Sequence, residues 1–268
     1  MSVITKKAGA LEYLTAEGIS VPHCFTTRFG GVSEGHLASL NLGIHRGDDP
    51  ENVRKNYEIL GEALGFDVDR LVFTRQTHTN IVRAVDASNA GEGLSREVLP
   101  ECDALVTDTP GLVLAAFTAD CTPILLHDPV TGAVGAVHAG WRGTVADIAG
   151  NTVRVMTERF GSRPECIRAA IGPNIGVCCF ETHADVPEAV RAVLGQAAED
   201  FIVPQGEKFR VDLKGVNAAL LRRAGVEHIE ISTECTACQP ERFWSHRRVG
   251  NARGSLAAII VCEGGNAK

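Results

Sequence analysis

The architecture of this chain follows from the segment Leu112-Val-Leu-Ala-Ala-Phe-Thr-Ala-Asp-Cys-Thr-Pro-Ile-Leu-Leu-His-Asp-Pro-Val-Thr-Gly-Ala-Val-Gly-Ala-Val-His-Ala-Gly-Trp-Arg-Gly143. It contains three short apolar runs, Leu112–Phe117, Pro123–His127 and Ala133–His138. Apolar runs without polar alternation are typical of strands that are covered on both faces. The sequence Asp128-Pro-Val-Thr-Gly132 separates the last two runs and predicts a hairpin turn. The segment therefore predicts adjacent strands in a buried sheet.

Strands and helices follow one another irregularly on both sides of this segment. The stretch 49–66 predicts a helix, because Asp49 can cap it and apolar residues recur on one face. A helix is also expected between a capping Thr144 and a terminating Gly161. The remaining expected strands are Leu71–Thr74, Ile81–Val85, Ala104–Thr107, Ile167–Ile171, His228–Ser232 and Ser255–Val261, and the remaining expected helices are Asp185–Leu194 and Leu213–Ala224. Without regular βαβ alternation or a linker, we expect one α+β domain over residues 1–268, a layered mixed β-sheet with flanking helices.

Composition and charge favour a small-molecule partner. The chain has 268 residues, and its net charge of −7 argues against nonspecific nucleic-acid binding and adhesion to anionic membranes. No apolar run approaches the roughly 20 residues of a membrane span, and the N-terminus lacks the apolar region of a signal peptide. Nine scattered cysteines fit a reducing compartment better than a disulfide framework. We therefore expect a cytoplasmic protein.

Three side chains in specific local sequences point to a metal site. His78 lies in Gln-Thr-His-Thr-Asn, Cys121 in Ala-Asp-Cys-Thr and His138 in His-Ala-Gly-Trp-Arg-Gly. The predicted hairpin would return His138 beside Cys121, and His78 would arrive from a third segment. Two imidazoles and one thiolate can hold zinc and leave its fourth position open for water or substrate. The alternative is a packing role, since an isolated His or Cys is more often structural.

The neighbours of this trio add further candidate groups. Trp141 offers an aromatic wall, and Arg142 a fork suited to an anion. The glycines of the same motif permit close backbone approach, and a helix expected directly after it could add N-terminal amides. Asp120 is a candidate for proton transfer or for support of the metal ligand, with a strand-end cap as the alternative.

Other clusters are less specific. Cys235-Thr-Ala-Cys238 has the spacing of a redox pair or zinc knuckle, but no second pair follows it, and His246 is the one further ligand nearby. In Phe243-Trp-Ser-His-Arg-Arg248, Arg247 is a candidate for binding phosphate, unless this is a solvated basic turn. Ser39-Leu-Asn-Leu-Gly43 either offers Asn41 to a substrate or caps a turn.

Eight motifs in order resemble the YfiH family, also called the laccase-domain or multicopper polyphenol oxidase family, which includes the bacterial peptidoglycan editing factor. The resemblance runs from about residue 20 to 262. The motifs are Thr27-Arg-Phe-Gly-Gly-Val-Ser33, Ser39-Leu-Asn-Leu-Gly43, Gly47-Asp-Asp49, Gln76-Thr-His78, Ala119-Asp-Cys121, His138-Ala-Gly-Trp-Arg-Gly143, Ile171-Gly-Pro173 and Ser245-His-Arg-Arg248.

The resemblance implies a mixed α/β domain in which His78, Cys121 and His138 bind Zn²⁺. It also implies phosphorolysis of purine nucleosides (adenosine, inosine and methylthioadenosine) and deamination of adenosine. Two positions depart from the family pattern, because Tyr57 stands where Arg is usual and His246 where Tyr is usual. A contact of that Arg with substrate would make the rate or preference of this chain different.

For these reactions, Asp120, Cys121 and His138 are the expected catalytic residues, and Asn41, Arg142 and Arg247 the expected substrate-binding residues. Phosphorolysis requires an anion site, for which Arg142 and Arg247 are the candidates.

Four alternatives remain open at this stage. One is a copper-dependent polyphenol oxidase, disfavoured because true laccase chemistry needs many His ligands. The second is a cysteine hydrolase with Cys121 as nucleophile and His138 as base. The third is a peptidoglycan-editing hydrolase that removes L-Ser from UDP-MurNAc-L-Ser. The last is a binding module stapled by zinc, with Cys178 or Cys179 as the fourth ligand.

Overall fold

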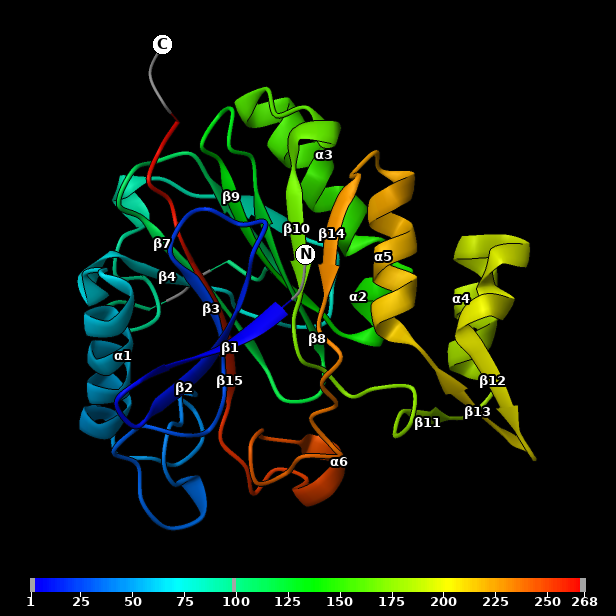
Figure 1. The fold of residues 1–268 in the computed structure, drawn as a ribbon, viewed down its shortest axis with the longest axis horizontal. Coiled ribbons are helices and arrows are strands. Elements are labelled where there is room, and N and C mark those ends of the chain that lie inside the picture. The colour runs from blue at the N-terminus through cyan, green and yellow to red at the C-terminus, as the bar shows by residue number, and fades with distance from the viewer. Residues whose placement is uncertain (1–2, 98–99, 266–268) are drawn as a thin grey trace.

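The computed structural model describes residues 3–97 and 100–265, and its elements form four stacked layers (Figure 1). Helix α1 (Pro50–Leu64) packs against the outer face of one six-stranded sheet. A second six-stranded sheet packs against the inner face of the first. Helices α3 (Ile148–Phe160) and α5 (Leu213–Arg223) cover the outer face of the second sheet. The central strands of both sheets are therefore buried on two sides, whereas the outer strands are partly exposed.

The first sheet joins the two ends of the chain to its middle. Its strand order is β1 (Val3–Ala8), β2 (Leu11–Ala16), β3 (His23–Thr26), β15 (Leu256–Val261), β7 (Val113–Thr118) and β4 (Leu71–Phe73). The alternate side chains of β7 explain its apolar sequence, since Val113 and Ala115 pack toward α1 whereas Leu114 and Ala116 pack toward the second sheet. With an apolar layer on each side, no position of this strand calls for a polar residue.

The second sheet carries the predicted hairpin at its centre. Its strand order is β14 (His228–Ile231), β10 (Arg168–Ile171), β8 (Thr122–His127), β9 (Val134–Ala139), β6 (Ala104–Thr107) and β5 (Val82–Ala84). Strands β8 and β9 pair in antiparallel orientation with Pro123 opposite His138. This register brings Cys121, directly before β8, to the same end of the sheet as His138.

A smaller unit lies beside these layers. It consists of a three-stranded sheet with α4, which has its own apolar cluster against α2 and α5. The elements are β11 (Glu181–Thr182), β12 (Ile202–Gln205), β13 (Lys208–Val211), α2 (Trp141–Val145) and α4 (Asp185–Leu194), with α6 (His246–Val249) near the C-terminal strand. Short 3-10 helices span Gly35–Leu37, Val68–Arg70, Ala87–Asn89, Pro164–Cys166 and Gly195–Phe201. In the described part of the chain, none of the helices has the length and apolarity needed to cross a membrane.

The expected elements are largely confirmed. Helix α1 is capped by Asp49, whose side chain accepts a hydrogen bond from the Glu51 amide, and it ends at Gly65 with φ of 77°. The expected start at Thr144 is wrong, because Thr144 lies inside α2 and the following helix is capped by Asp147. Three strands before residue 27 and the small sheet were not predicted, because their sequences are short and partly polar. The α+β class with mixed sheets and flanking helices is confirmed.

Candidate active site

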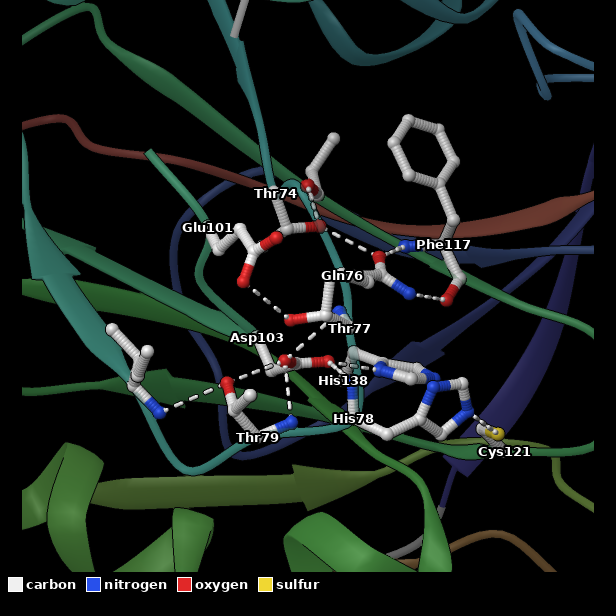
Figure 2. A network of polar contacts seen from close by, with 12 residues as sticks. Thr74, Gln76, Thr77, His78, Thr79, Glu101, Asp103, Phe117, Cys121 and His138 are labelled. Carbon is white, nitrogen blue, oxygen red and sulfur yellow. Dashed lines mark hydrogen bonds and ion pairs between the residues drawn. The ribbon is translucent and has the colours of Figure 1, made fainter. Parts of the chain in front are cut away.

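Three soft donor groups meet at one end of the second sheet (Figure 2). His78 lies in the loop after β4, Cys121 directly precedes β8, and His138 lies in β9. The Nε2 atom of His78 is 3.8 Å from the Sγ atom of Cys121, and the two imidazole rings have centroids 4.9 Å apart. One ligand atom from each residue lies within 4.8 Å of the other two. A single ion with bonds of about 2.0–2.3 Å fits between such donors, and two nitrogens with one thiolate suit zinc.

The buried carboxylate of Asp103 orients this cluster. Its Oδ1 accepts hydrogen bonds from Nδ1 of His138 at 2.7 Å and from the backbone N–H of His78 at 3.1 Å. Its Oδ2 accepts from the amides of Thr77 and Thr79 and from the hydroxyl of Thr79 (Figure 2). Because Nδ1 of His138 donates to Asp103, Nε2 is the nitrogen available to a metal ion. The same carboxylate holds His78 in the left-handed conformation, with φ of 63°.

Electrostatics polarise the cluster. Burial opposes ionisation of Cys121, but the neighbouring charge and hydrogen bond of His138 lower the pKa of the thiol below its usual value. Burial likewise opposes protonation of His138, and the Cys121 thiolate and Asp103 nevertheless raise its pKa. The pKa of Asp103 falls to about 2, because the hydrogen bonds from His138 and Thr79 outweigh burial. Cys121 is therefore a thiolate near neutral pH, the form that binds metals and attacks electrophiles.

Two glycines let the backbone approach this cluster closely, as the sequence predicts. A Cβ atom on Gly140 would lie 2.5 Å from Cδ2 of His78 and 3.4 Å from the sulfur of Cys121. A Cβ atom on Gly143 would lie 2.9 Å from the carbonyl oxygen of Thr79. The glycines thus leave room for the loop that carries His78.

Asp120 connects the cluster to the C-terminal part of the chain. Its carboxylate accepts hydrogen bonds from the hydroxyl of Thr236 at 2.6 Å, the hydroxyl of Ser245 at 3.0 Å and the backbone N–H of Arg247 at 2.6 Å. Its backbone is also in the left-handed region, with φ of 87°. These contacts make Asp120 a positioning residue for the turn that presents Cys121.

A cavity of about 850 Å³ opens beside the three donors. Such a volume lies within the range of typical small-molecule sites, about 300–1,000 Å³. Its lining combines His78, Cys121 and His138 with the rings of Phe73 and Phe117. The cavity can therefore hold a flat, ring-bearing molecule against the metal-binding groups.

The charged side chains among the described lining residues are mostly cationic, since they comprise Arg46, Arg75, Arg96 and Arg253 against one carboxylate, Glu97. The Nε atom of Arg253 is buried without a hydrogen-bond partner, while its Nη1 donates to the carbonyl of Gly254. Burial and then the nearby positive charge of Arg46 lower the pKa of Arg253 to about 10. Because the side chains of Arg46 and Arg253 both line this cavity, their guanidinium groups can offer N–H donors to an anion.

The expected substrate-binding residues lie elsewhere. The cavity lining includes Gly43 but not Asn41, Arg142 or Arg247. Asn41 is fully buried, and its amide group bonds to Gly43, Asp48 and the Ser255 amide, so it shapes the cavity wall from behind. Arg142 is exposed and stacks on Trp141, with 4.3 Å from its guanidinium carbon to the ring centroid.

Arg247 and the two departures from the family pattern also lie outside the lining. Arg247 donates to the carbonyls of Cys179 and Glu181. Tyr57 is buried in the core, where its hydroxyl donates to the carbonyl of Leu42 at 2.8 Å. His246 is exposed at the start of α6. Neither departure therefore places a side chain in the cavity.

Sequence reasoning missed Asp103, Arg46 and Arg253. The signal for Asp103 was one acidic residue directly before a strand that begins with three apolar residues. Arg46 and Arg253 had no comparable signal, since about 200 residues separate them and an isolated Arg is usually solvated.

Four cysteines form a second group of metal-binding side chains. No second pair follows Cys235 and Cys238 along the sequence, but Cys178 and Cys179, which precede them, lie beside them in the fold. His246 is not part of this group. Cys178 and Cys179 are likewise absent from the group of His78, Cys121 and His138, so neither completes that site as a fourth ligand.

The chain is similar to known proteins over most of its length. Residues 22–263 match the family model described as multi-copper polyphenol oxidoreductase laccase. The chain is 42% identical over 254 residues to a purine nucleoside phosphorylase of Deinococcus radiodurans, covering 94% of each chain. It is 39% identical over 243 residues to purine nucleoside phosphorylase YlmD of Geobacillus stearothermophilus, covering 88% of each.

The fold is also similar to that of solved structures. The crystal structure of the hypothetical protein YfiH from Bacillus licheniformis superposes with a TM-score of 0.90 at 36% sequence identity. The match covers 96% of this chain and 98% of that one.

Proposed function

The chain belongs to the multi-copper polyphenol oxidoreductase laccase family, and on that premise we propose that it is a zinc-dependent purine nucleoside phosphorylase. The proposed substrates are adenosine, inosine and methylthioadenosine, and the same site would deaminate adenosine. The observation that carries the proposal is the pair Arg46 and Arg253 in the cavity that also holds the three metal-binding groups. The names of the relatives supply the substrate class.

Phosphate would bind at Arg46 and Arg253. A guanidinium pair that lines one cavity can offer several N–H donors to a tetrahedral anion. We therefore assign phosphate binding to Arg46 and Arg253 instead of Arg142 and Arg247, the candidates that the sequence suggested.

Phosphorolysis at this site needs positioning more than covalent chemistry by the protein. An oxygen of the bound phosphate forms a bond to the anomeric carbon of the ribose while the bond from that carbon to the purine nitrogen breaks. The purine leaves with the electron pair of that bond and gains, directly or through water, the proton that the hydrogen phosphate loses. Phe73 and Phe117 line the cavity and provide apolar surface for the base.

His78, Cys121 and His138 would hold the zinc ion, with Asp103 keeping Nε2 of His138 free for it. When bound, zinc polarises a substrate group or lowers the pKa of a bound water toward neutrality, the property that deamination at purine C6 requires. Asp120 keeps Cys121 in place through the contacts of its carboxylate.

Release of purine from inosine and phosphate tests this function directly. We expect His78→Ala to lose turnover while remaining folded, and Arg253→Gln to raise the KM for phosphate by roughly 10-fold or more, because bonds to charged groups contribute about 1.5–3 kcal/mol. Arg222→Ala, an exposed position on α5, is the matched control. Unchanged turnover in His78→Ala contradicts the metal assignment, and an unchanged KM for phosphate in Arg253→Gln contradicts the anion site.

One observation favours a second candidate function. Asp103, His138 and the Cys121 thiolate form the carboxylate, imidazole and nucleophile sequence of a cysteine hydrolase. Such an enzyme could cleave the amide bond of UDP-MurNAc-L-Ser. Activity on this substrate in metal-free protein, with a covalent adduct on Cys121, would support it. Loss of activity on chelation with recovery by zinc would exclude the metal-free thiol mechanism.

Copper is tested by the same preparations. Stoichiometric copper in protein purified without added metal, together with phenol oxidation, would favour the oxidase chemistry that the family description suggests.

We also propose that the chain works as one domain. The family match over residues 22–263 and the apolar core shared by the two large sheets support this proposal.

A further inference from the structure

Four cysteines from two distant segments lie close together beyond one end of the second sheet. Cys178 and Cys179 follow β10, and Cys235 and Cys238 follow β14. Strands β10 and β14 pair in parallel, with Ile171 beside Ile231, so the chain leaves both strands at the same end of the sheet. The segments continue side by side through a bridge between Asn174 and Cys235.

The sulfur atoms are close enough to share one ion. The Sγ atom of Cys238 lies 3.4 Å from the Sγ atoms of both Cys178 and Cys179. All four sulfurs lie within 4.8 Å of one another. Four thiolates around one tetrahedral zinc, with bonds of about 2.3 Å, lie about 3.8 Å apart. A multi-iron cluster would separate them further, because each thiolate then binds a different iron atom.

The surroundings suit a negatively charged metal centre. The backbone N–H of Gly176 donates to the sulfur of Cys235 at 3.1 Å, an interaction that stabilises thiolate. The ammonium group of Lys214 is buried beneath the turn and donates to the carbonyls of Ser232 and Glu234 at 2.8 and 2.5 Å. Zinc with four thiolates has a net charge of about −2, so a buried cation beside it gains a partner.

We propose that Cys178, Cys179, Cys235 and Cys238 bind a second zinc ion, in a closed structural site. Four protein ligands leave no position for a substrate, which distinguishes this site from the one at the cavity. None of the four cysteines lines that cavity.

The site has a mechanical connection to the cavity. Thr236 lies between Cys235 and Cys238, and its hydroxyl donates to Asp120 at 2.6 Å. On the other segment, the amide of Ile175 donates to the carbonyl of Asp120 at 2.9 Å. A metal ion that joins the two segments therefore also fixes the turn that presents Cys121.

The metal content of the purified full chain tests the proposal. We expect two zinc ions per chain by mass spectrometry of the elements, and one in the double variant Cys178→Ser with Cys238→Ser. After cobalt substitution, that variant should lose about four fifths of the thiolate-to-metal absorption, because four of five coordinating thiolates belong to this site. Cys166→Ser, outside both groups, is the control and should retain two ions and the full absorption.

A second variant covers the case in which the serine substitutions prevent folding. The double variant His78→Ala with His138→Ala leaves all four cysteines in place and should retain one ion with the spectrum of a four-thiolate site. A single ion in the wild-type chain that this variant loses would overturn the proposal. A disulfide between Cys238 and Cys178 or Cys179 in protein prepared under reducing conditions would also overturn it.

Discussion

The two groups of metal-binding side chains in this protein use similar donors in opposite settings. His78, Cys121 and His138 lie at one end of the second sheet, beside a cavity of about 850 Å³. The four-cysteine group lies on two loops, and none of its members lines that cavity. The first group offers three ligands and space for a fourth partner, whereas the second offers four ligands.

The difference suggests that two features decide whether a metal site serves catalysis or stability. These are the number of protein ligands and whether other side chains hold those ligands in place. At the cavity, Asp103 fixes the ligands from behind, so the site keeps its shape with an open position. At the four-cysteine group, the ion itself would supply the link between two segments. The first site is therefore expected to control turnover, and the second to control resistance to unfolding.

Loss of the thiolate at the cavity should give the largest effect. Because changes in supporting residues of metal sites already cost 10–100-fold, we expect Cys121→Ser to reduce kcat/KM for phosphorolysis by more than about 100-fold. The midpoint of thermal unfolding should fall less than when the four-cysteine site loses its ion, because three protein ligands are expected to bind zinc less tightly than four thiolates. Cys166→Ser should be normal in both measurements. Full activity with a strongly lowered midpoint would exchange the roles assigned to the two groups.

Cys235→Ser should produce the reverse pattern. Removing a bound ion at 100 times its dissociation constant costs about 2.7 kcal/mol of unfolding free energy. A loss of this size lowers the unfolding midpoint by roughly 5–11 °C in a chain of this size. We expect that shift in calorimetry, with kcat/KM reduced only a few-fold, and a loss of activity as large as that of Cys121→Ser would contradict a structural role.

Asp103→Asn should separate support of the open site from its ligands. The amide keeps the size of the carboxylate but removes its charge and one acceptor for His138 or for the loop of His78. We expect zinc affinity at the cavity to fall by about 10–100-fold, whereas the second ion stays bound. Competition with a chromophoric chelator measures both ions, and an equal loss of both would indicate general unfolding.

Asp120→Asn should give the smallest effect, because it weakens only the connection between the groups. An amide oxygen can still accept some of the hydrogen bonds that now come from Thr236, Ser245 and Arg247. We expect a decrease in kcat/KM of a few-fold and a loss of about 1–2 kcal/mol in unfolding free energy. A loss of turnover comparable to that of Cys121→Ser, with unchanged zinc content, would instead assign Asp120 a role in proton transfer.

The sequence predicted the central hairpin and its consequence for the site. The apolar runs around Asp128–Gly132 indicated β8 and β9, and the observed pairing of Pro123 with His138 confirms that Cys121 and His138 lie together. This prediction succeeded because a hairpin is local, and its turn sets the register of its strands.

The polar contacts across the fold were not predictable in the same way. Asp103 and His138 are hydrogen-bonded although they are 35 residues apart in the sequence. Arg46 influences the pKa of Arg253 because the loop after Gly43 lies beside Ser255, to which Arg46 donates a hydrogen bond. From the sequence, Cys178 or Cys179 is expected only as a fourth ligand of the first site. Their actual neighbours depend on the parallel pairing of β10 with β14, which the sequence does not indicate.

Local sequence patterns specify the strands that the two large sheets contain after residue 70, and side-chain chemistry specifies which residues can act as metal donors. The three-dimensional fold sets which donors lie close together, which carboxylate orients them and which arginines line the cavity. Metal bonds and hydrogen bonds act over about 2–3 Å, so they depend on strand order and loop exits rather than on separation along the chain.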